Sequence, residues 1–83
     1  MILLYFAAVR QALGKGEEKR ALPQDVRTVR ELIAHLANLG PAYASVFGDP
    51  THLKTAVNQT YASLDTSVVE NDEVAFFPPV TGG

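Results

Sequence analysis

The chain contains no cysteine. Disulfide bonds, thiolate zinc sites and cysteine nucleophiles are therefore excluded, and any sulfur chemistry cannot be that of a cysteine side chain. Runs of basic residues are also missing, and nine acidic residues against seven basic ones give a net charge of −2. Such a chain has no basic stripe to follow nucleic-acid phosphates, so we expect no nucleic-acid partner.

The opening residues do not have the pattern of a secretory signal peptide either. The apolar opening, residues 1–9, has no basic region before it, and Arg10 interrupts it early. This pattern is typical of a strand rather than of a signal peptide. We therefore expect a cytoplasmic protein with no membrane partner, in which the sequon Asn58-Gln59-Thr60 carries no glycan.

What is present favours one folded domain. Eighty-three residues suffice for a single domain with a modest core, and a hydrophobic fraction of 47% excludes a disordered chain. We expect the domain to cover residues 1–79 and a flexible tail to cover residues 80–83.

The first part of the chain predicts a strand, a short helix and a second strand. The apolar run of residues 2–6 is typical of a central strand. Residues 8–13 are good helix formers, and Gly14 behind them predicts a helix cap. The charged segment 17–22 suits a strand at the edge of a sheet.

The principal helix is predicted to begin at Thr28. Thr28 and Glu31 have the spacing of a capping box, in which each side chain satisfies a free backbone donor. Gly40 and Pro41 supply the stop, and residues 42–47 are expected to add a short turn at most. The apolar stripe expected to face the sheet consists of Val29, Leu32, Ile33, Leu36 and Leu39.

The last part of the chain predicts a hairpin and a final strand. Residues 54–57 and 60–63 flank Asn58-Gln59, a two-residue loop whose asparagine tolerates positive φ. The apolar segment 73–77 predicts the last strand, which we expect beside the first one at the sheet centre. The predicted fold class is α+β, a β-grasp with a mixed five-stranded sheet packed against one principal helix.

The end of the last strand is its most unusual part. Strand alternation opposes Phe77 to Val74 and Phe76, so Phe77 is expected outside if the other two face the helix. Which of Tyr5 and Phe6 is buried on the neighbouring strand stays open at this point. The prolines at 78 and 79 end strand pairing and favour an extended exit toward the terminal Gly82-Gly83.

No internal active site emerges from the spacing of reactive side chains. His35 and His52 have no metal-ligand or catalytic-triad spacing, so we expect no metal. The remaining unusual group is the Gly83 carboxylate, which is unhindered and ionised at neutral pH. Activation of this carboxylate by ATP would have to occur on a partner, because the chain has no phosphate-binding loop.

At this point the residues carry a family resemblance. The tail from Val74 to Gly83, the segment Val57-Asn58-Gln59 and the opening Phe6-Ala7 resemble the small, sulfur-carrier subunits of molybdopterin synthases. The resemblance covers the full length and implies a ubiquitin-like β-grasp fold. It implies no stably bound cofactor and no enzymatic activity of the isolated chain, because the catalytic pocket lies in the large synthase subunit.

The resemblance also implies a reaction cycle and its partners. An E1-like enzyme uses ATP to adenylate the terminal glycine, and a sulfurtransferase supplies the sulfur for a thiocarboxylate. The carrier then donates sulfur to cyclic pyranopterin monophosphate within a heterotetramer. In this chain Gly83 would carry the sulfur, Val80, Thr81 and Gly82 would thread into the partner, and the interface would comprise Phe6, Tyr61, Phe77, Pro78 and Pro79.

Two other classes of function stay open. The chain could carry sulfur for another pathway, such as thiamine synthesis or tRNA thiolation, whose carriers are similar mainly at Gly-Gly. It could also be a ubiquitin-like adaptor, or a modifier conjugated to lysines. In those cases the tail would be a recognition peptide or a conjugation site rather than a sulfur donor.

Overall fold

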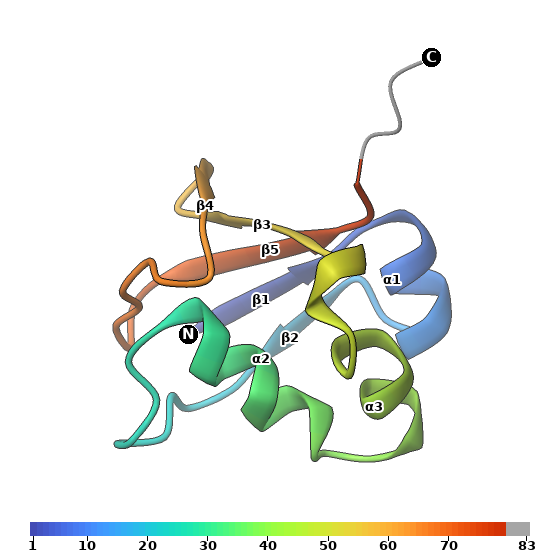
Figure 1. The fold of residues 1–83 in the computed structure, drawn as a ribbon, viewed down its shortest axis with the longest axis horizontal. Coiled ribbons are helices and arrows are strands. Elements are labelled where there is room, and N and C mark those ends of the chain that lie inside the picture. Colours follow the sequence, from blue (N-terminus) through green and yellow to red (C-terminus); the bar gives the residue numbers. More distant parts are fainter. Residues whose placement is uncertain (80–83) are drawn as a thin grey trace.

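The computed structural model describes residues 1–79. Its centre is a five-stranded sheet in the order β2-β1-β5-β3-β4 (Figure 1). Strands β1 and β5 are parallel neighbours, and the other pairs are antiparallel. The predicted mixed sheet with the first and last strands side by side is confirmed. The strands are β1 (Ile2–Tyr5), β2 (Glu17–Lys19), β3 (Lys54–Val57), β4 (Thr60–Ala62) and β5 (Glu73–Phe77).

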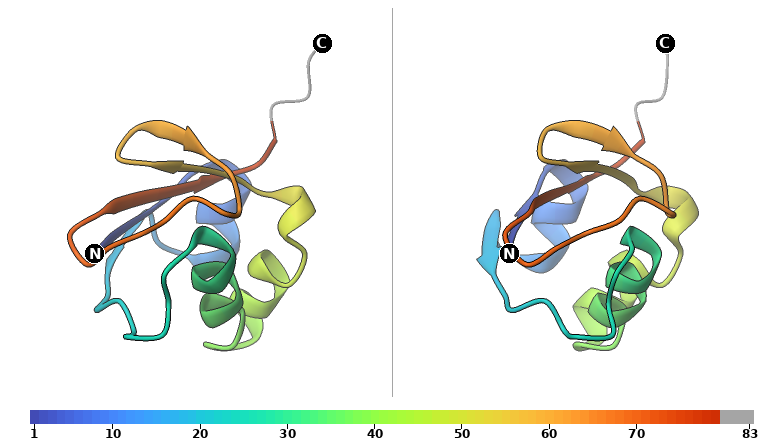
Figure 2. Two further views of the ribbon diagram at one scale, coloured as in Figure 1. Left: turned by 60° about the vertical axis from the view of Figure 1, so that its left-hand side comes forward. Right: turned by 90° about the vertical axis from the view of Figure 1, so that its left-hand side faces the viewer.

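Helices cover one side of this sheet. Figure 2 shows α2 and α3 on the same side, with no helix against the opposite side in the part of the chain that is described. The parallel pairing of β1 and β5 requires a long connection, which supplies these helices. The helices are α1 (Ala7–Leu13), α2 (Val29–Ala37), α3 (Pro41–Phe47) and a 3₁₀ turn, η1 (Pro50–His52).

Helix α2 begins where the sequence predicts. The Glu31 amide donates to Thr28 Oγ1 at 3.2 Å, and Glu31 Oε1 accepts from the Arg27 amide at 2.9 Å. Both side chains of the predicted capping box thus satisfy a backbone donor, although the Glu31 carboxylate accepts from the amide of Arg27, one residue before the N-cap, rather than from that of Thr28. Helix α1 ends as expected too, since Gly14 adopts φ 74°, a left-handed cap.

Several predicted details are wrong. Strand β4 ends at Ala62 rather than at residue 63, and α1 begins at Ala7 rather than at residue 8. Strand β2 stops at Lys19 rather than Leu22, because the Leu22 amide leaves the sheet and donates to Glu70 at 2.6 Å. Strand β1 stops at Tyr5, and α2 ends at Ala37 before the last residue of the predicted stripe. Residues 42–47 are not a single turn but most of α3, a shorter helix that accompanies the principal helix α2.

The core lies between the sheet and the helices. From α2 it receives four of the five predicted stripe residues, and Leu39 is only partly buried. Rings from β1, α3 and β5 meet beneath the sheet, with the Phe47 and Phe76 centroids 5.0 Å apart and edge-on. The side chains with the least exposure are Leu3, Tyr5, Val29, Leu36, Phe47, Val74 and Phe76.

The hairpin between β3 and β4 also anchors β5. Asn58 and Gln59 have φ of 51° and 68°, the positive values of the predicted two-residue turn. Asn58 Oδ1 accepts from the Glu73 amide at 3.0 Å, and Asn58 Nδ2 donates to Asp72 Oδ1 at 2.9 Å. The turn therefore holds the first residue of β5 in place. Among residues 1–79, no helix is long and apolar enough to cross a membrane.

Candidate functional site

The uncovered side of the sheet, which we call the outer face, is apolar at its centre. Its residues alternate with the buried ones, because successive strand side chains point to opposite sides. The register aligns Leu4 with Ala75, Ala75 with Ala56, and Ala56 with Tyr61. Leu4 and both alanines are only partly buried, and Tyr61 is 79% exposed. This row is a sheet surface that no described segment covers.

Phe77 lies beside this row, at the point where the chain leaves the sheet. Its ring centroid is 6.0 Å from that of Tyr61, at a tilt of 55°. Phe6 continues β1 in an extended conformation, and its amide donates to the Phe76 carbonyl at 3.1 Å. The β1–β5 register, extended by one residue, thus places Phe6 next to Phe77. Phe6 is 48% exposed, whereas Tyr5 is buried, which settles the open question about β1.

The Phe77 ring thus lies against Tyr61, and the extended register places Phe6 on its other side. That these three residues contact a partner stays a prediction. Pro78 and Pro79 follow Phe77 directly and are half-buried. The predicted threading residues Val80, Thr81 and Gly82, and the predicted sulfur-carrying residue Gly83, lie outside the described residues. Phe6, Tyr61, Phe77 and the two prolines are hereafter called the tail-exit surface.

Sequence reasoning missed one residue of this region, Lys54. It is exposed, and the register pairs it directly with Phe77. A groove of about 330 Å³ runs here between β3, β4 and the end of β5. Nothing in the local sequence marks Lys54, because its place beside Phe77 depends on the pairing of two distant strands. The groove is lined by Lys54, Thr55, Tyr61, Ala62 and Phe77.

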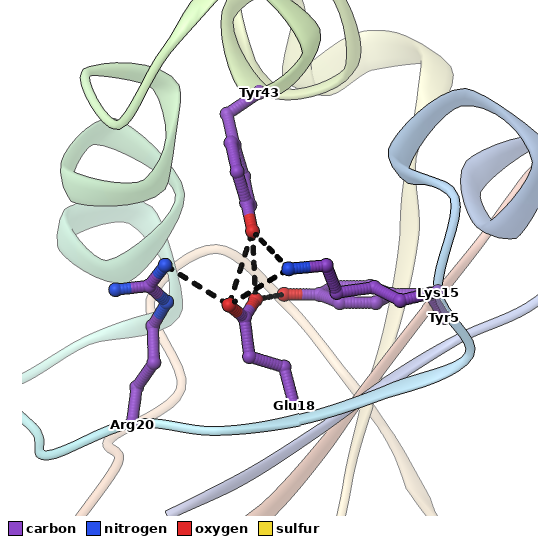
Figure 3. Close-up of polar contacts among 5 residues, drawn as sticks. All are labelled: Tyr5, Lys15, Glu18, Arg20 and Tyr43. Carbon is purple, nitrogen blue, oxygen red and sulfur yellow. Dashed lines mark hydrogen bonds and ion pairs between the residues drawn. The ribbon is translucent and has the colours of Figure 1, made fainter.

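A polar cluster lies on the other, helix-covered side of the sheet (Figure 3). Glu18 on β2 is its centre, with a side chain only 10% exposed. Glu18 accepts hydrogen bonds from Tyr5 at 2.8 Å and from Tyr43 at 3.0 Å, and it pairs with Arg20 at 2.9 Å. Lys15 donates to the Tyr43 hydroxyl at 3.2 Å and to Glu18 at 3.4 Å. The cluster joins β1, β2 and α3.

The electrostatics of this cluster are those of a hydrogen-bonded ion pair, in which the Glu18 carboxylate has several donors while the buried Arg20 Nε has no hydrogen-bond partner among the described residues. Burial raises the pKa of Glu18, but hydrogen bonds from Tyr5, Arg20 and Tyr43 outweigh burial and leave the pKa below its usual value. Burial, then the hydrogen bond to Glu18, raises the pKa of Tyr5 far above its usual value. An ionised carboxylate among protonated donors has no proton to exchange at neutral pH. We therefore assign the cluster to structure and not to acid–base catalysis.

Comparison with known proteins places this geometry in a family. Residues 3–83 match the ThiS family. The chain belongs to the ThiS family. It is 43% identical over 81 residues to the molybdopterin synthase sulfur carrier subunit of Escherichia coli K12, covering 98% of this chain and 96% of the relative. The corresponding subunit of Haemophilus influenzae is 38% identical over 81 residues, with the same coverage. The resemblance carried by the tail motif is thus confirmed.

Solved structures resemble this ThiS-family chain over nearly its whole length. SAMP1 from Haloferax volcanii has a TM-score of 0.76 and 31% identity, covering 100% of this chain and 98% of that one. A putative molybdopterin converting factor subunit 1 from Pyrococcus furiosus has a TM-score of 0.73 and 33% identity, covering 95% of each chain. The predicted ubiquitin-like β-grasp fold is confirmed.

Proposed function

We propose that this protein is the sulfur carrier subunit of a molybdopterin synthase. One observation carries the proposal: β5 ends at Phe77 in the tail-exit surface, and the sequence Pro-Pro-Val-Thr-Gly-Gly follows directly. The chain thus combines an aromatic surface with an unhindered terminal glycine a few residues further on. This combination suits a protein that docks on a partner through the surface and inserts its C-terminus into the partner's active site. The names of the relatives from E. coli and H. influenzae support the same pathway.

The proposed chemistry begins at the Gly83 carboxylate. One carboxylate oxygen attacks the α-phosphorus of ATP on an E1-like partner, so that pyrophosphate leaves and a glycyl-adenylate forms. The terminal sulfur of a sulfurtransferase persulfide then attacks the carbonyl carbon, and AMP leaves with the original oxygen. A thiol supplies the two electrons that cleave the resulting acyl disulfide. The product is a thiocarboxylate, whose sulfur is a better nucleophile than the oxygen it replaces.

Delivery of the sulfur takes place in the large subunit. The thiocarboxylate sulfur forms a bond to an oxygen-bearing carbon of cyclic pyranopterin monophosphate, and the C–O bond of that carbon breaks so that its oxygen leaves with the electron pair, as phosphate or as water. Another water molecule then cleaves the remaining acyl–sulfur bond and returns the carrier carboxylate. Two carriers supply the two sulfurs of one dithiolene. The chain lends no acid or base to these steps, so its own contribution is positioning.

The distance from the surface to the reacting atom supports this division of labour. Four residues follow Pro79, and when extended they reach at most about 13–14 Å. The tail-exit surface is therefore suited to docking, while chemistry takes place in a pocket of the partner. Absence of a Cβ at the last two positions would let that pocket close around the backbone.

The deciding experiment is mass spectrometry after incubation with the activating enzyme, ATP and a sulfur source from the same organism. We expect the terminal peptide to gain the mass difference between sulfur and oxygen. Trypsin cuts after Lys54, and the resulting peptide 55–83 contains no methionine, so oxidation of Met1 cannot mimic the signal. An unchanged mass in all conditions would overturn the proposal.

A matched variant lacks Gly82 and Gly83. We expect it to gain no sulfur and to keep the parent melting temperature, because these residues follow the last strand and its two prolines. A lowered melting temperature would show that the tail supports the fold.

A second candidate function follows from a further solved structure, that of small archaeal modifier protein 1 from H. volcanii, which has a TM-score of 0.77 and is 29% identical to this chain. A modifier would form an amide between Gly83 and a lysine of another protein. Incubation of a tagged chain with cell extract and ATP would then give ladders of larger species on a denaturing gel. A sulfur carrier alone would give the thiocarboxylate and no ladder.

A further inference from the structure

The cation at position 54 stands inside an apolar surface. Lys54 is exposed on β3, directly beside Phe77 in the register, and both residues line the groove with Tyr61. Within residues 1–79 no carboxylate lies within ion-pair distance of its ammonium group. By contrast, Lys15 has an intramolecular partner in Glu18 at 3.4 Å. Lys54 is therefore available to a group from outside the domain.

Any protein that covers the aromatic rings must cover this cation as well. Phe77 lies between Phe6 on one side and Lys54 on the other, with the Tyr61 ring 6.0 Å away. A docked partner would remove water from the groove, and a buried ammonium group without a counter-charge is strongly destabilising. A partner that covers Lys54 therefore binds more favourably if it brings an anionic group to this ammonium.

We propose that Lys54 is a specificity-determining residue, which pairs with an aspartate or glutamate of the large synthase subunit. This inference rests on the proposed function, because it takes the large subunit as the occupant of the groove. The expected partner segment presents an apolar side chain over Phe77 and Tyr61, flanked by a carboxylate. The Tyr61 hydroxyl can add a hydrogen bond to the same acidic group.

The anionic pterin substrate is a poorer match for this cation. Lys54 lies at the start of the exit, whereas the reacting atom of Gly83 lies up to about 13–14 Å beyond Pro79 when the tail is extended. Lys54 is thus placed to contact the partner protein where the tail leaves the sheet, and not to contact the substrate at the sulfur.

The test uses the large subunit encoded by the same organism and titration calorimetry at two salt concentrations. Lys54→Met keeps the apolar stem and removes the charge, and we expect a dissociation constant about tenfold weaker with a reduced salt dependence. Lys54→Glu should weaken binding by about a hundredfold or more, since two carboxylates would then meet. Both variants should keep the parent melting temperature, because the side chain is exposed.

The matched control is Lys19→Glu, a charge reversal on the exposed β2 edge that pairs with Ile2 at the other end of β1. We expect its affinity to stay within about twofold of the parent, because a specific contact is local whereas general steering depends on the net charge. Replacing the contacting aspartate or glutamate of the large subunit by lysine should restore binding to the Lys54→Glu variant.

Each result decides the matter. Parent affinity for Lys54→Met, or equal losses for Lys54→Glu and Lys19→Glu, would overturn the proposed pair and leave the proposed function intact. If the unmodified chain fails to bind the large subunit at all, the proposed function itself is wrong.

Discussion

The two faces of the central strands differ although their residues alternate in the same segments. On β5, Val74 and Phe76 have 0% exposure, whereas Ala75 and Phe77 are only partly buried. The two phenylalanines are adjacent in sequence and chemically identical. One packs against Phe47 at 5.0 Å, and the other meets Tyr61 at 6.0 Å on the outer face. The position of a side chain relative to the sheet therefore decides whether the same residue type is buried in the core or presented on the outer face.

A similar contrast separates the charged residues. Glu18 under the sheet is surrounded by donors from its own chain, and its charge contributes to the fold. Lys54 on the outer face has no such partner within residues 1–79. Glu18 on the inner face thus has its partners within the chain, whereas Lys54 on the outer face has no carboxylate partner among the described residues. Four substitutions test this division, and we take them from the largest expected effect to the smallest.

Phe76→Ala should cause the greatest loss. The ring is fully buried against Phe47 and Tyr5, and truncating a buried phenylalanine costs about 3–5 kcal/mol. Total stabilities are about 5–15 kcal/mol, so much of the protein could unfold at 37 °C. Thermal and denaturant unfolding measure the loss. If Phe76→Ala kept its stability but lost its partner, the assignment of the two faces would be inverted.

Leu36→Ala tests the layer that faces the sheet. Leu36 on α2 has 0% exposure, and we expect the free energy of unfolding to fall by about 2–5 kcal/mol. Arg30→Ala on the exposed side of the same helix is the control, because its pair with Asp65 is a surface ion pair of about 1 kcal/mol or less. A denaturant midpoint equal to that of the parent would remove Leu36 from the core.

Phe77→Ala should have the opposite profile to Phe76→Ala. We expect affinity for the large subunit to fall by roughly thirtyfold, the effect of losing about 2 kcal/mol from a central aromatic contact. The melting temperature should change little, because the ring is only partly buried. Calorimetry and a melting curve on the same sample separate the two quantities. Parent affinity in this variant would remove Phe77 from the docking surface.

Glu18→Gln should have the smallest effect and depend on pH. The pKa of Glu18 is lowered in the folded state, so its ionised form contributes stability above the unfolded value of about 4.3, and the contribution is lost as pH falls through the folded pKa. We expect a loss of about 1–2 kcal/mol at pH 7, since hydrogen bonds to a charged group are replaced by neutral ones. Denaturant unfolding across pH 2.5–7 should show this difference shrinking on acidification. A constant difference would mean that the charge of Glu18 is not involved.

Short sequence motifs correctly predicted those elements that are stabilised by residues close in sequence. The cap at Thr28, the turn at Asn58 and the left-handed Gly14 each depend on a few neighbouring residues, so their patterns are visible in the chain. Helix α3 was missed because its seven residues have little helix-forming pattern of their own. It is held by Phe47, which packs on rings from β1 and β5, and by the contact of Tyr43 with Glu18.

The candidate site divides in the same way. Alternation along one strand was sufficient to predict that Phe77 faces outward, since this needs only a period of two. Placing Phe6 beside it required the pairing of β1 with β5, which the apolar content of the two strands favoured. Lys54 and the Glu18 cluster escaped prediction because they depend on exact neighbours across strands that are distant in sequence.

The bonds from Asn58 to Asp72 and Glu73 also set the usable length of the tail. A slip of β5 by one residue would be rejected, because it would exchange the buried and exposed phenylalanines. A slip by two residues would keep every apolar side chain on its own face, yet it would lengthen or shorten the free end by about 6–7 Å. Burial alone does not forbid that second error. The side-chain amide of Asn58 makes a two-residue slip costly, because the slip would break its hydrogen bonds with Asp72 and Glu73. Asn58 thereby fixes the register of β5 and, with it, the number of residues that follow the strand.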